Sequence, residues 1–129
     1  MKKLIACLAI TAGLGTSALA TPALAAGTPA PRALNASQAR NAAIIKSVWP
    51  AATENWAVRI AIRESGLRSN AISRTGDYGL MQINWRAHRG WLRKYGITSP
   101  RQLLDPAVNA RMALLLYRKA GSNPWRATR

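Results

Sequence analysis

Apolar positions recur along the chain at three- and four-residue intervals, a spacing that predicts several short helices. Apolar residues recur at helical spacing over 37–48, and Ser37 is a suitable N-cap for this first helix. A second helix is expected over 53–65, with Thr53 as its N-cap. Gly66 then occupies the position at which left-handed backbone commonly ends a helix.

The second half of the chain continues this pattern after one stretch of a different kind. Residues 66–79 are rich in Gly, Asn, Ser and Thr, which favour turns, and 80–83 is a short apolar run. We interpret that run as a short strand or as one arm of a small hairpin. Further helices are expected over 86–94, over 99–104 and, after an Asp-Pro start signal, over 105–119. The pattern predicts a mainly α fold with one small β element.

The N-terminal residues are typical of a secretory signal peptide. Two lysines precede an apolar, Ala-rich run at 4–20, and small residues follow at the spacing of a cleavage site. We place cleavage after Ala25, with Ala20 as the alternative. Glycines interrupt the run, which argues against a permanent transmembrane helix. A lipoprotein-like box ends at Cys7, but it lies too early in the run.

These features predict one exported domain. We assign 1–25 to the signal peptide, 26–36 to a flexible lead-in and 37–129 to a single domain, which we expect to be monomeric. The predicted location is the periplasm or the extracellular cell wall. Cys7 is the only cysteine, so the exported domain has no disulfide and no thiol chemistry.

Charge narrows the choice of partners. The chain has 19 Lys and Arg against 4 Asp and Glu, a formal net charge of +15. Loss of Lys2 and Lys3 with the signal peptide leaves +13. Such a surface attracts polyanions, and for an exported protein these are anionic wall polymers or a membrane surface. Nucleic acid conflicts with the signal peptide and is not expected.

Glu64 is the first candidate for chemistry. It continues the apolar face of Trp56 and Ile60 and lies near the end of the second predicted helix. Partial burial and the negative end of the helix dipole both favour a protonated carboxyl, as a general acid requires. The nearby Arg63 and Arg68 favour the ionised form. The plain alternative is a solvated glutamate at a helix end.

Asp77 is the second candidate. It lies between two glycines, where an ordinary turn aspartate is the plain alternative. If 80–84 is extended, Gln82 and Asn84 share one face and could offer amides to a sugar. A carboxyl group on a helix that faces a second one on a loop or strand is the arrangement used in glycoside cleavage.

Several motifs together resemble the lytic transglycosylase SLT domain of the lysozyme-like superfamily. The resemblance covers roughly residues 48 to 126, and the pair formed by E-S and G-L-M-Q is its most specific part. The motifs are E-S-G-L at 64–67, A-I-S at 71–73, G-D-Y-G-L-M-Q-I-N at 76–84, D-P-A-V-N-A-R-M-A at 105–113 and N-P-W at 123–125.

The resemblance implies a compact α+β helical lobe with one hairpin or strand beside a cleft. It also implies cleavage of the β-1,4 bond between N-acetylmuramic acid and N-acetylglucosamine in peptidoglycan, with 1,6-anhydro products. Glu64 would be the catalytic acid, and Ser65 and Gln82 would line the cleft. Further candidates for substrate contact are Tyr78, Asn84, Trp85 and Tyr117. We expect no cofactor, and His88, the only histidine, has no neighbours that would complete a metal site.

Two departures keep other functions open. A small residue is usual in the family where Asp77 stands, and the G-D-Y-G-L-M-Q-I-N segment is similar to the strand of animal-type lysozymes that carries a second carboxylate. The alternative is therefore a muramidase that hydrolyses the same bond with Asp77 as its second carboxylate. Tyr117 is shifted by about one residue from the family's late tyrosine, and Leu116 is nearer that place. A third hypothesis is a cationic wall-binding or membrane-active protein without catalysis.

Overall fold

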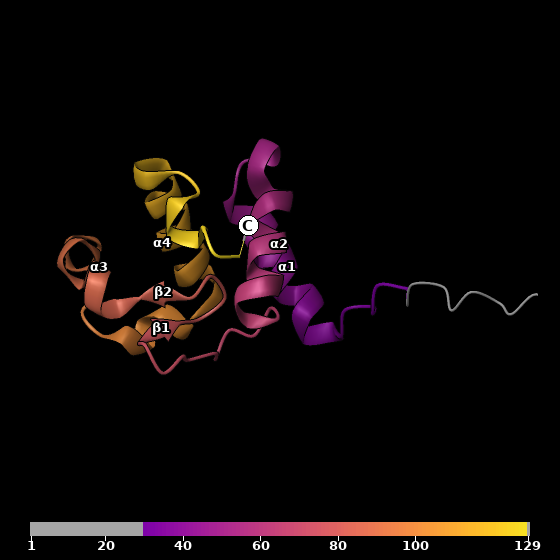
Figure 1. Ribbon diagram of the computed structural model, residues 1–129, viewed down its shortest axis with the longest axis horizontal. Coiled ribbons are helices and arrows are strands. Elements are labelled where there is room, and N and C mark those ends of the chain that lie inside the picture. Colours follow the sequence, from indigo (N-terminus) through magenta and orange to yellow (C-terminus); the bar gives the residue numbers. More distant parts are fainter. Residues whose placement is uncertain (1–29, 129) are drawn as a thin grey trace, which may run out of the picture. The chain divides into compact units, whose positions relative to one another are not determined.

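Four α-helices and one two-stranded antiparallel hairpin form the described part of the chain, residues 30–128 of the computed structural model (Figure 1). The predicted mainly α class with one small β element is confirmed. In chain order the elements are α1 (Ala36–Val48), α2 (Ala51–Ser65), β1 (Asp77–Tyr78), β2 (Ile83–Asn84), α3 (Trp85–Leu92), the 3-10 helices η1 (Arg93–Tyr95) and η2 (Pro100–Leu104), α4 (Pro106–Ala120) and the 3-10 helix η3 (Asn123–Trp125).

The predicted export segment cannot be compared with the structure. Residues 1–25, together with the first four positions of the predicted lead-in, lie outside the described residues. From residue 30 to residue 128, no helix combines the length and the apolar character that crossing a membrane requires.

The helix ends follow local capping chemistry, with two differences from the prediction. The N-cap of α1 is Asn35 instead of Ser37, because Asn35 and Gln38 exchange side chain–backbone hydrogen bonds in a capping box. Helix α2 begins at Ala51, directly after a proline, instead of at Thr53. Pro50 is the N-cap and makes no side-chain hydrogen bond, while Thr53 lies in the first turn and its hydroxyl donates to the Pro50 carbonyl oxygen at 3.3 Å. The predicted end at Gly66, with φ of 62°, is confirmed.

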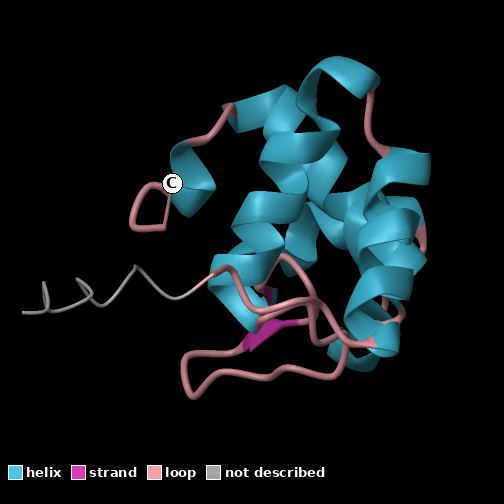
Figure 2. Ribbon diagram, turned by 90° about the vertical axis from the view of Figure 1, so that its right-hand side faces the viewer, coloured by secondary structure: helices cyan, strands magenta, loops and turns pink. Residues whose placement is uncertain are grey.

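Helix α1 packs against both α2 and α4, and the hairpin lies at one end of these helices (Figures 1 and 2). The core between them is apolar, but two tryptophans also donate hydrogen bonds across it. Trp49 donates its indole N–H to the carbonyl oxygen of Ala110 at 3.1 Å, and Trp125 donates to that of Met81 at 2.8 Å. These bonds satisfy buried carbonyl groups on α4 and on the hairpin.

The hairpin differs from the predicted strand over 80–83. Its strands pair Asp77 with Asn84 and Tyr78 with Ile83, and the residues between them form the turn. Leu80, Met81 and Ile83 are all buried, so the expected alternation of faces is absent. Gln82 has a positive φ of 48°. The turn adopts this shape because side chains of the surrounding helices, instead of a neighbouring strand, bond its backbone.

Asn109 on α4 is the main partner of that turn. Its side chain is fully buried, accepts from the Met81 N–H at 2.9 Å and donates to the carbonyl oxygens of Tyr78 and Leu103, each at 2.8 Å. Gly79 lies against it with φ of 76°, and a Cβ there would be 2.3 Å from the Leu103 carbonyl oxygen. Only glycine fits this approach of the hairpin to α4.

Candidate active site

Glu64 lies in the last turn of α2 and is half-buried. Its Oε1 accepts a hydrogen bond from the hydroxyl of Thr128, which lies in the turn after η3. The same hydroxyl lies 3.3 Å from the carbonyl oxygen of Trp125. Arg63 donates to the Thr128 carbonyl oxygen at 2.7 Å, so the segment after η3 is bonded to the end of α2 at two points.

Asp77 has a very different set of partners. Its Oδ2 accepts from the hydroxyls of Ser73 and Thr75, and its Oδ1 accepts from the side-chain amide of Asn84 at 2.9 Å. Burial by itself would raise the pKa of Asp77, but the three hydrogen bonds together lower it below its usual value. Asp77 is therefore an ionised carboxylate whose two oxygens are both bonded within its own loop and hairpin.

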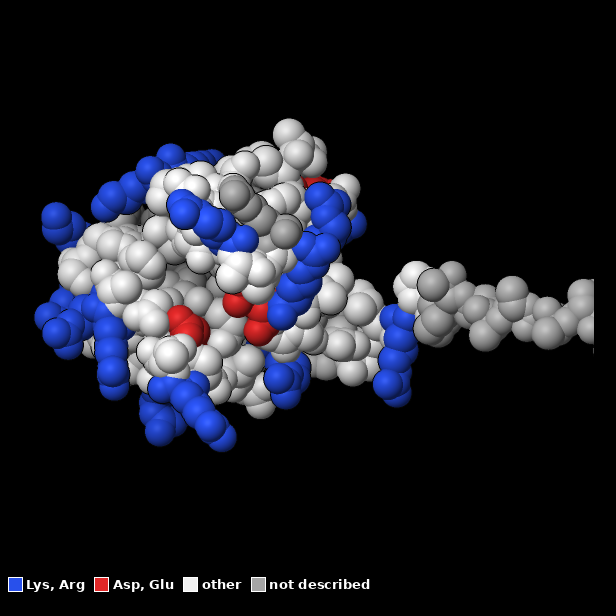
Figure 3. Space-filling model, viewed as in Figure 1, with Lys and Arg blue, Asp and Glu red and all other residues white. Residues whose placement is uncertain are grey.

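The hairpin and α2 are bonded to each other next to these carboxyl groups. The Ser65 hydroxyl is 3% exposed and lies 2.8 Å from the Leu80 carbonyl oxygen and 3.1 Å from that of Ala61. This contact connects the residue after Glu64 to the hairpin turn. Figure 3 shows acidic side chains around a hollow on one face, while Lys and Arg side chains extend at the edges of that face.

The chain matches the model of the transglycosylase SLT domain over residues 42–125, more than half of its length. The chain belongs to this family. No curated protein and no solved structure gave a match.

Because the chain belongs to the SLT domain family, the general chemistry of that family applies to it. The family is lysozyme-like and cleaves the glycan strands of peptidoglycan, a substrate outside the cytoplasm. Peptidoglycan is therefore the substrate class of this chain. The matched segment contains both Glu64 and Asp77, but not Thr128.

The two amide side chains that were predicted to contact the sugar form hydrogen bonds with other groups of the protein. Gln82 donates through Nε2 to the carbonyl oxygens of Ala71 at 3.1 Å and Gly79 at 2.9 Å. Asn84 caps α3 by accepting from the Ala87 N–H at 2.9 Å, while its amide donates to Asp77. Both side chains thus stabilise the loop that carries Asp77.

The predicted aromatic contacts are half-buried. Tyr78, Trp85 and Tyr117 pack against the core of the domain. The Tyr117 ring lies 4.9 Å from that of Trp56 and 5.3 Å from that of Trp49, measured between centroids. Tyr117 therefore belongs to an aromatic cluster between α1, α2 and α4.

No group of three or more His, Cys, Asp or Glu side chains that could ligate a metal occurs within residues 30–128. His88 packs against the Trp91 ring at 5.9 Å. Burial and the positive charge of Lys119 both lower the pKa of His88, so the ring is neutral at neutral pH.

Sequence reasoning missed the residues that bond the two carboxyl groups. Ser73 and Thr75 precede Asp77 by four and two positions, a spacing at which hydroxyls can reach a turn aspartate, so a local signal was present. Thr128 is 64 residues from Glu64 in the sequence, and only the tertiary fold brings the two together.

Proposed function

We propose that this protein is an exported lytic transglycosylase in which Glu64 acts first as general acid and then as general base. The observation that carries this proposal is the contrast between the two carboxyl groups within an SLT domain. Glu64 has a single hydroxyl partner at a helix end, whereas both oxygens of Asp77 are already bonded by three side chains.

The reaction needs one group that exchanges a proton. Protonated Glu64 gives its proton to the glycosidic oxygen, and the bond between that oxygen and C1 of the muramic acid breaks with an oxocarbenium-like transition state. The 6-hydroxyl of the same sugar then attacks C1, and its proton goes to Glu64. The product is a 1,6-anhydro sugar, no water is consumed, and Glu64 returns to its protonated form.

Thr128 supports this role by orienting the carboxyl group. Its hydroxyl bonds Oε1 of Glu64, so Oε2 is the oxygen that carries the proton in the proposed reaction. The Trp125 carbonyl oxygen gives the Thr128 hydroxyl a second acceptor, 3.3 Å away. Thr128 is thus a positioning residue that keeps one carboxyl oxygen fixed while the other exchanges its proton.

The other predicted residues have supporting roles in this proposal. Ser65, Gln82 and Asn84 fix the hairpin beside the glycan, and Trp85 and Tyr78 offer partly exposed rings at its edge. Tyr117 supports α2 from the aromatic cluster. The charge of +13 expected after export favours attachment to anionic wall polymer, and we expect the protein to act as a monomer.

A muramidase is the second candidate, and one observation favours it. The hydrogen bonds that lower the pKa of Asp77 keep it ionised. An ionised carboxylate on the far face of the sugar is the second group that a retaining hydrolase uses. Water would then release a reducing sugar in place of the anhydro product.

Mass spectrometry of the muropeptides released from purified peptidoglycan tests the proposal. We expect products that lack one water relative to the reducing forms, both from the parent and from Asp77→Asn. Reducing products from the parent, together with an inactive Asp77→Asn protein, would make the enzyme a muramidase. A folded parent that binds walls without releasing any muropeptide would favour the non-catalytic, cationic alternative.

Export is a separate part of the proposal. We assign residues 1–25 to a signal peptide that is removed after Ala25, with Ala20 as the alternative site. N-terminal sequencing of the secreted protein checks this directly. A new N-terminus at residue 26 supports the first site, and one at residue 21 supports the second. An intact N-terminus in the cytoplasm would contradict export.

A further inference from the structure

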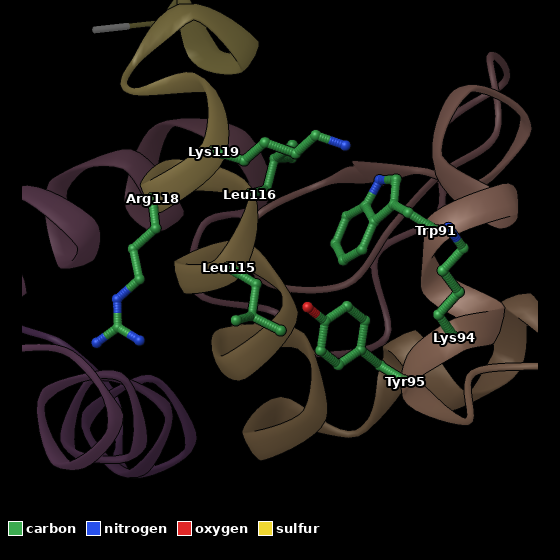
Figure 4. A pocket seen from close by; sticks show the side chains of 7 residues that line it. All are labelled: Trp91, Lys94, Tyr95, Leu115, Leu116, Arg118 and Lys119. Atoms are coloured by element: carbon green, nitrogen blue, oxygen red, sulfur yellow. The ribbon is translucent and has the colours of Figure 1, made fainter.

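A cavity of about 450 Å³ lies between the end of α3 with η1 on one side and the C-terminal half of α4 on the other (Figure 4). Trp91 of α3 and Tyr95 of η1 form one wall, and Leu115 and Leu116 of α4 form the other. The ammonium group of Lys119 extends across the cavity toward Trp91 (Figure 4). The volume is within the range of ~300–1,000 Å³ found for ligand sites.

A second cavity of about 610 Å³ continues the first one toward α1. Three residues, Tyr95, Leu115 and Arg118, line both cavities, so the two are contiguous along α4. The Arg118 side chain extends away from Trp91 (Figure 4), and Arg118 lines both cavities. Together the cavities form an elongated groove, which we call the α4 groove. Such a shape suits a chain-like ligand.

Apart from Ser47, the side chains that line the α4 groove are apolar, aromatic or cationic. Four cations line it: Lys94, Arg118 and Lys119 at the first cavity, and Arg111 with Arg118 at the second. No Asp, Glu, Asn or Gln side chain lines either cavity. A neutral glycan strand would leave these four cations without an anionic partner, so the lining favours an anionic ligand.

The lining suits a ligand that combines carboxylates with small apolar side chains. Cationic side chains form charge-assisted hydrogen bonds with carboxylates, and the Leu and aromatic walls bury methyl groups. A polymer of phosphate groups would use the cations but would leave the apolar walls without a partner. A short acidic peptide uses both.

We propose that the α4 groove binds the peptide stem of peptidoglycan. The stem is a short peptide attached to the glycan, and it carries free carboxylates and small apolar side chains. The inference rests on the proposed function, because only a glycan-cleaving enzyme meets the stem as part of its substrate. The groove would give the enzyme a preference for glycan strands that still carry their stems.

Paired substrates test the preference. Soluble glycan strands with intact stems are compared with the same strands after an amidase has removed the stems, and kcat/KM is measured on both. We expect the parent to prefer the stem-bearing strands. Arg118 is exposed, and loss of one exposed ion pair corresponds to about two- to fivefold in that preference. Arg118→Met is therefore expected to reduce the ratio by this amount.

Arg101→Met is the matched control. Arg101 is an exposed arginine of η2 that lines neither cavity, so its replacement removes the same charge outside the groove. We expect its ratio to equal that of the parent. Equal ratios for the parent and both folded variants, with both substrates cleaved, would overturn the groove proposal and leave the proposed function intact. Lys94→Met replaces Arg118→Met if the latter does not fold.

A binding measurement keeps the groove testable if no strand is cleaved. A synthetic stem peptide is titrated into the parent, and the Trp91 indole N–H signal is followed by NMR, with Trp91→Phe used for assignment. We expect a saturable shift that is weakened in Arg118→Met. A shift with a glycerol phosphate oligomer but none with the peptide would assign the groove to phosphate polymers and overturn the proposal. No shift with either ligand would also overturn it.

Discussion

Asp77 lies in the hairpin and Glu64 lies next to it, yet their hydrogen-bond partners come from different parts of the sequence. The partners of Asp77 are all within seven residues of it in the sequence, and they occupy both of its oxygens. Glu64 is bonded through one oxygen by Thr128, which is 64 residues away. Local turn chemistry therefore lowers the pKa of Asp77, whereas tertiary structure positions Glu64 through one of its oxygens.

The largest effect is expected from Glu64→Gln. The amide keeps the shape of the side chain and can still accept from Thr128, but it cannot carry the proton. General acid–base catalysis contributes about 10²–10⁴-fold in rate, and a loss of that size is expected in muropeptide release. The melting temperature should stay within a few degrees of the parent. A folded Glu64→Gln protein with near-parental activity would disprove the role of Glu64.

Gly79→Ala tests the framework that places the hairpin beside Glu64. A Cβ at Gly79 would lie 2.3 Å from the Leu103 carbonyl oxygen and 2.4 Å from Nδ2 of Asn109, at a positive φ. We expect the free energy of unfolding to fall by about 2–4 kcal/mol, from strain and overpacking together.

The control for this variant is Gly76→Ala, beside Asp77. It has the same kind of backbone, with φ of 85°, but no atom lies within 4 Å of its added Cβ. We expect Gly76→Ala to lower the free energy of unfolding by the backbone strain alone, about 1–2 kcal/mol. Urea unfolding curves measure both variants. If both variants lose the same free energy of unfolding, the close approach of the hairpin to α4 does not contribute to stability.

Thr128→Val should have a smaller effect that is confined to catalysis. The valine keeps the volume of the side chain but donates no hydrogen bond to Glu64. One such bond is worth roughly 1–1.5 kcal/mol, so kcat should fall by about tenfold while KM is unchanged. Thr128→Ser retains the hydroxyl and should restore kcat. A rise in KM without a change in kcat would mean that Thr128 contacts the substrate instead of orienting Glu64.

Much of the helical framework was predictable because its signals are local. Asp105 followed by proline starts α4, and its carboxylate accepts from the Val108 N–H as an N-cap should. Gly66 ends α2 in left-handed backbone. Glycine and proline restrict the backbone wherever they stand, so these ends depend little on the rest of the fold.

The hairpin was predicted less well because distant residues determine its shape. The run over 80–83 has the composition of a strand, but Ser65, Asn109 and Trp125 bond the backbone of its turn. No pattern within the run shows that these partners exist. For the same reason the half-buried position of Glu64 could be predicted from its helix face, whereas its contact with Thr128 could not.

The smallest effect on activity is expected from Asp77→Asn, and its effect on stability depends on pH. The hydrogen bonds to Asp77 lower its pKa in the folded state below the value of about 3.9 in an unfolded chain. The unfolded state therefore binds more protons at acid pH. The stabilisation from Asp77 is fully present above about pH 4, and it is lost as the pH falls through the folded-state pKa. The asparagine variant lacks this contribution at every pH.

Urea unfolding of the parent and of Asp77→Asn at pH 5 and at pH 2 measures this difference. We expect the parent to lose more stability than the variant between the two pH values, and parallel losses would contradict the ionised, fully bonded Asp77. Muropeptide release near neutral pH completes the comparison. If Asp77 serves only its own loop, its replacement should change kcat by no more than about threefold, which is less than 1 kcal/mol. A loss as large as that of Glu64→Gln would place both carboxyl groups in the reaction, because only a hydrolase needs the second one.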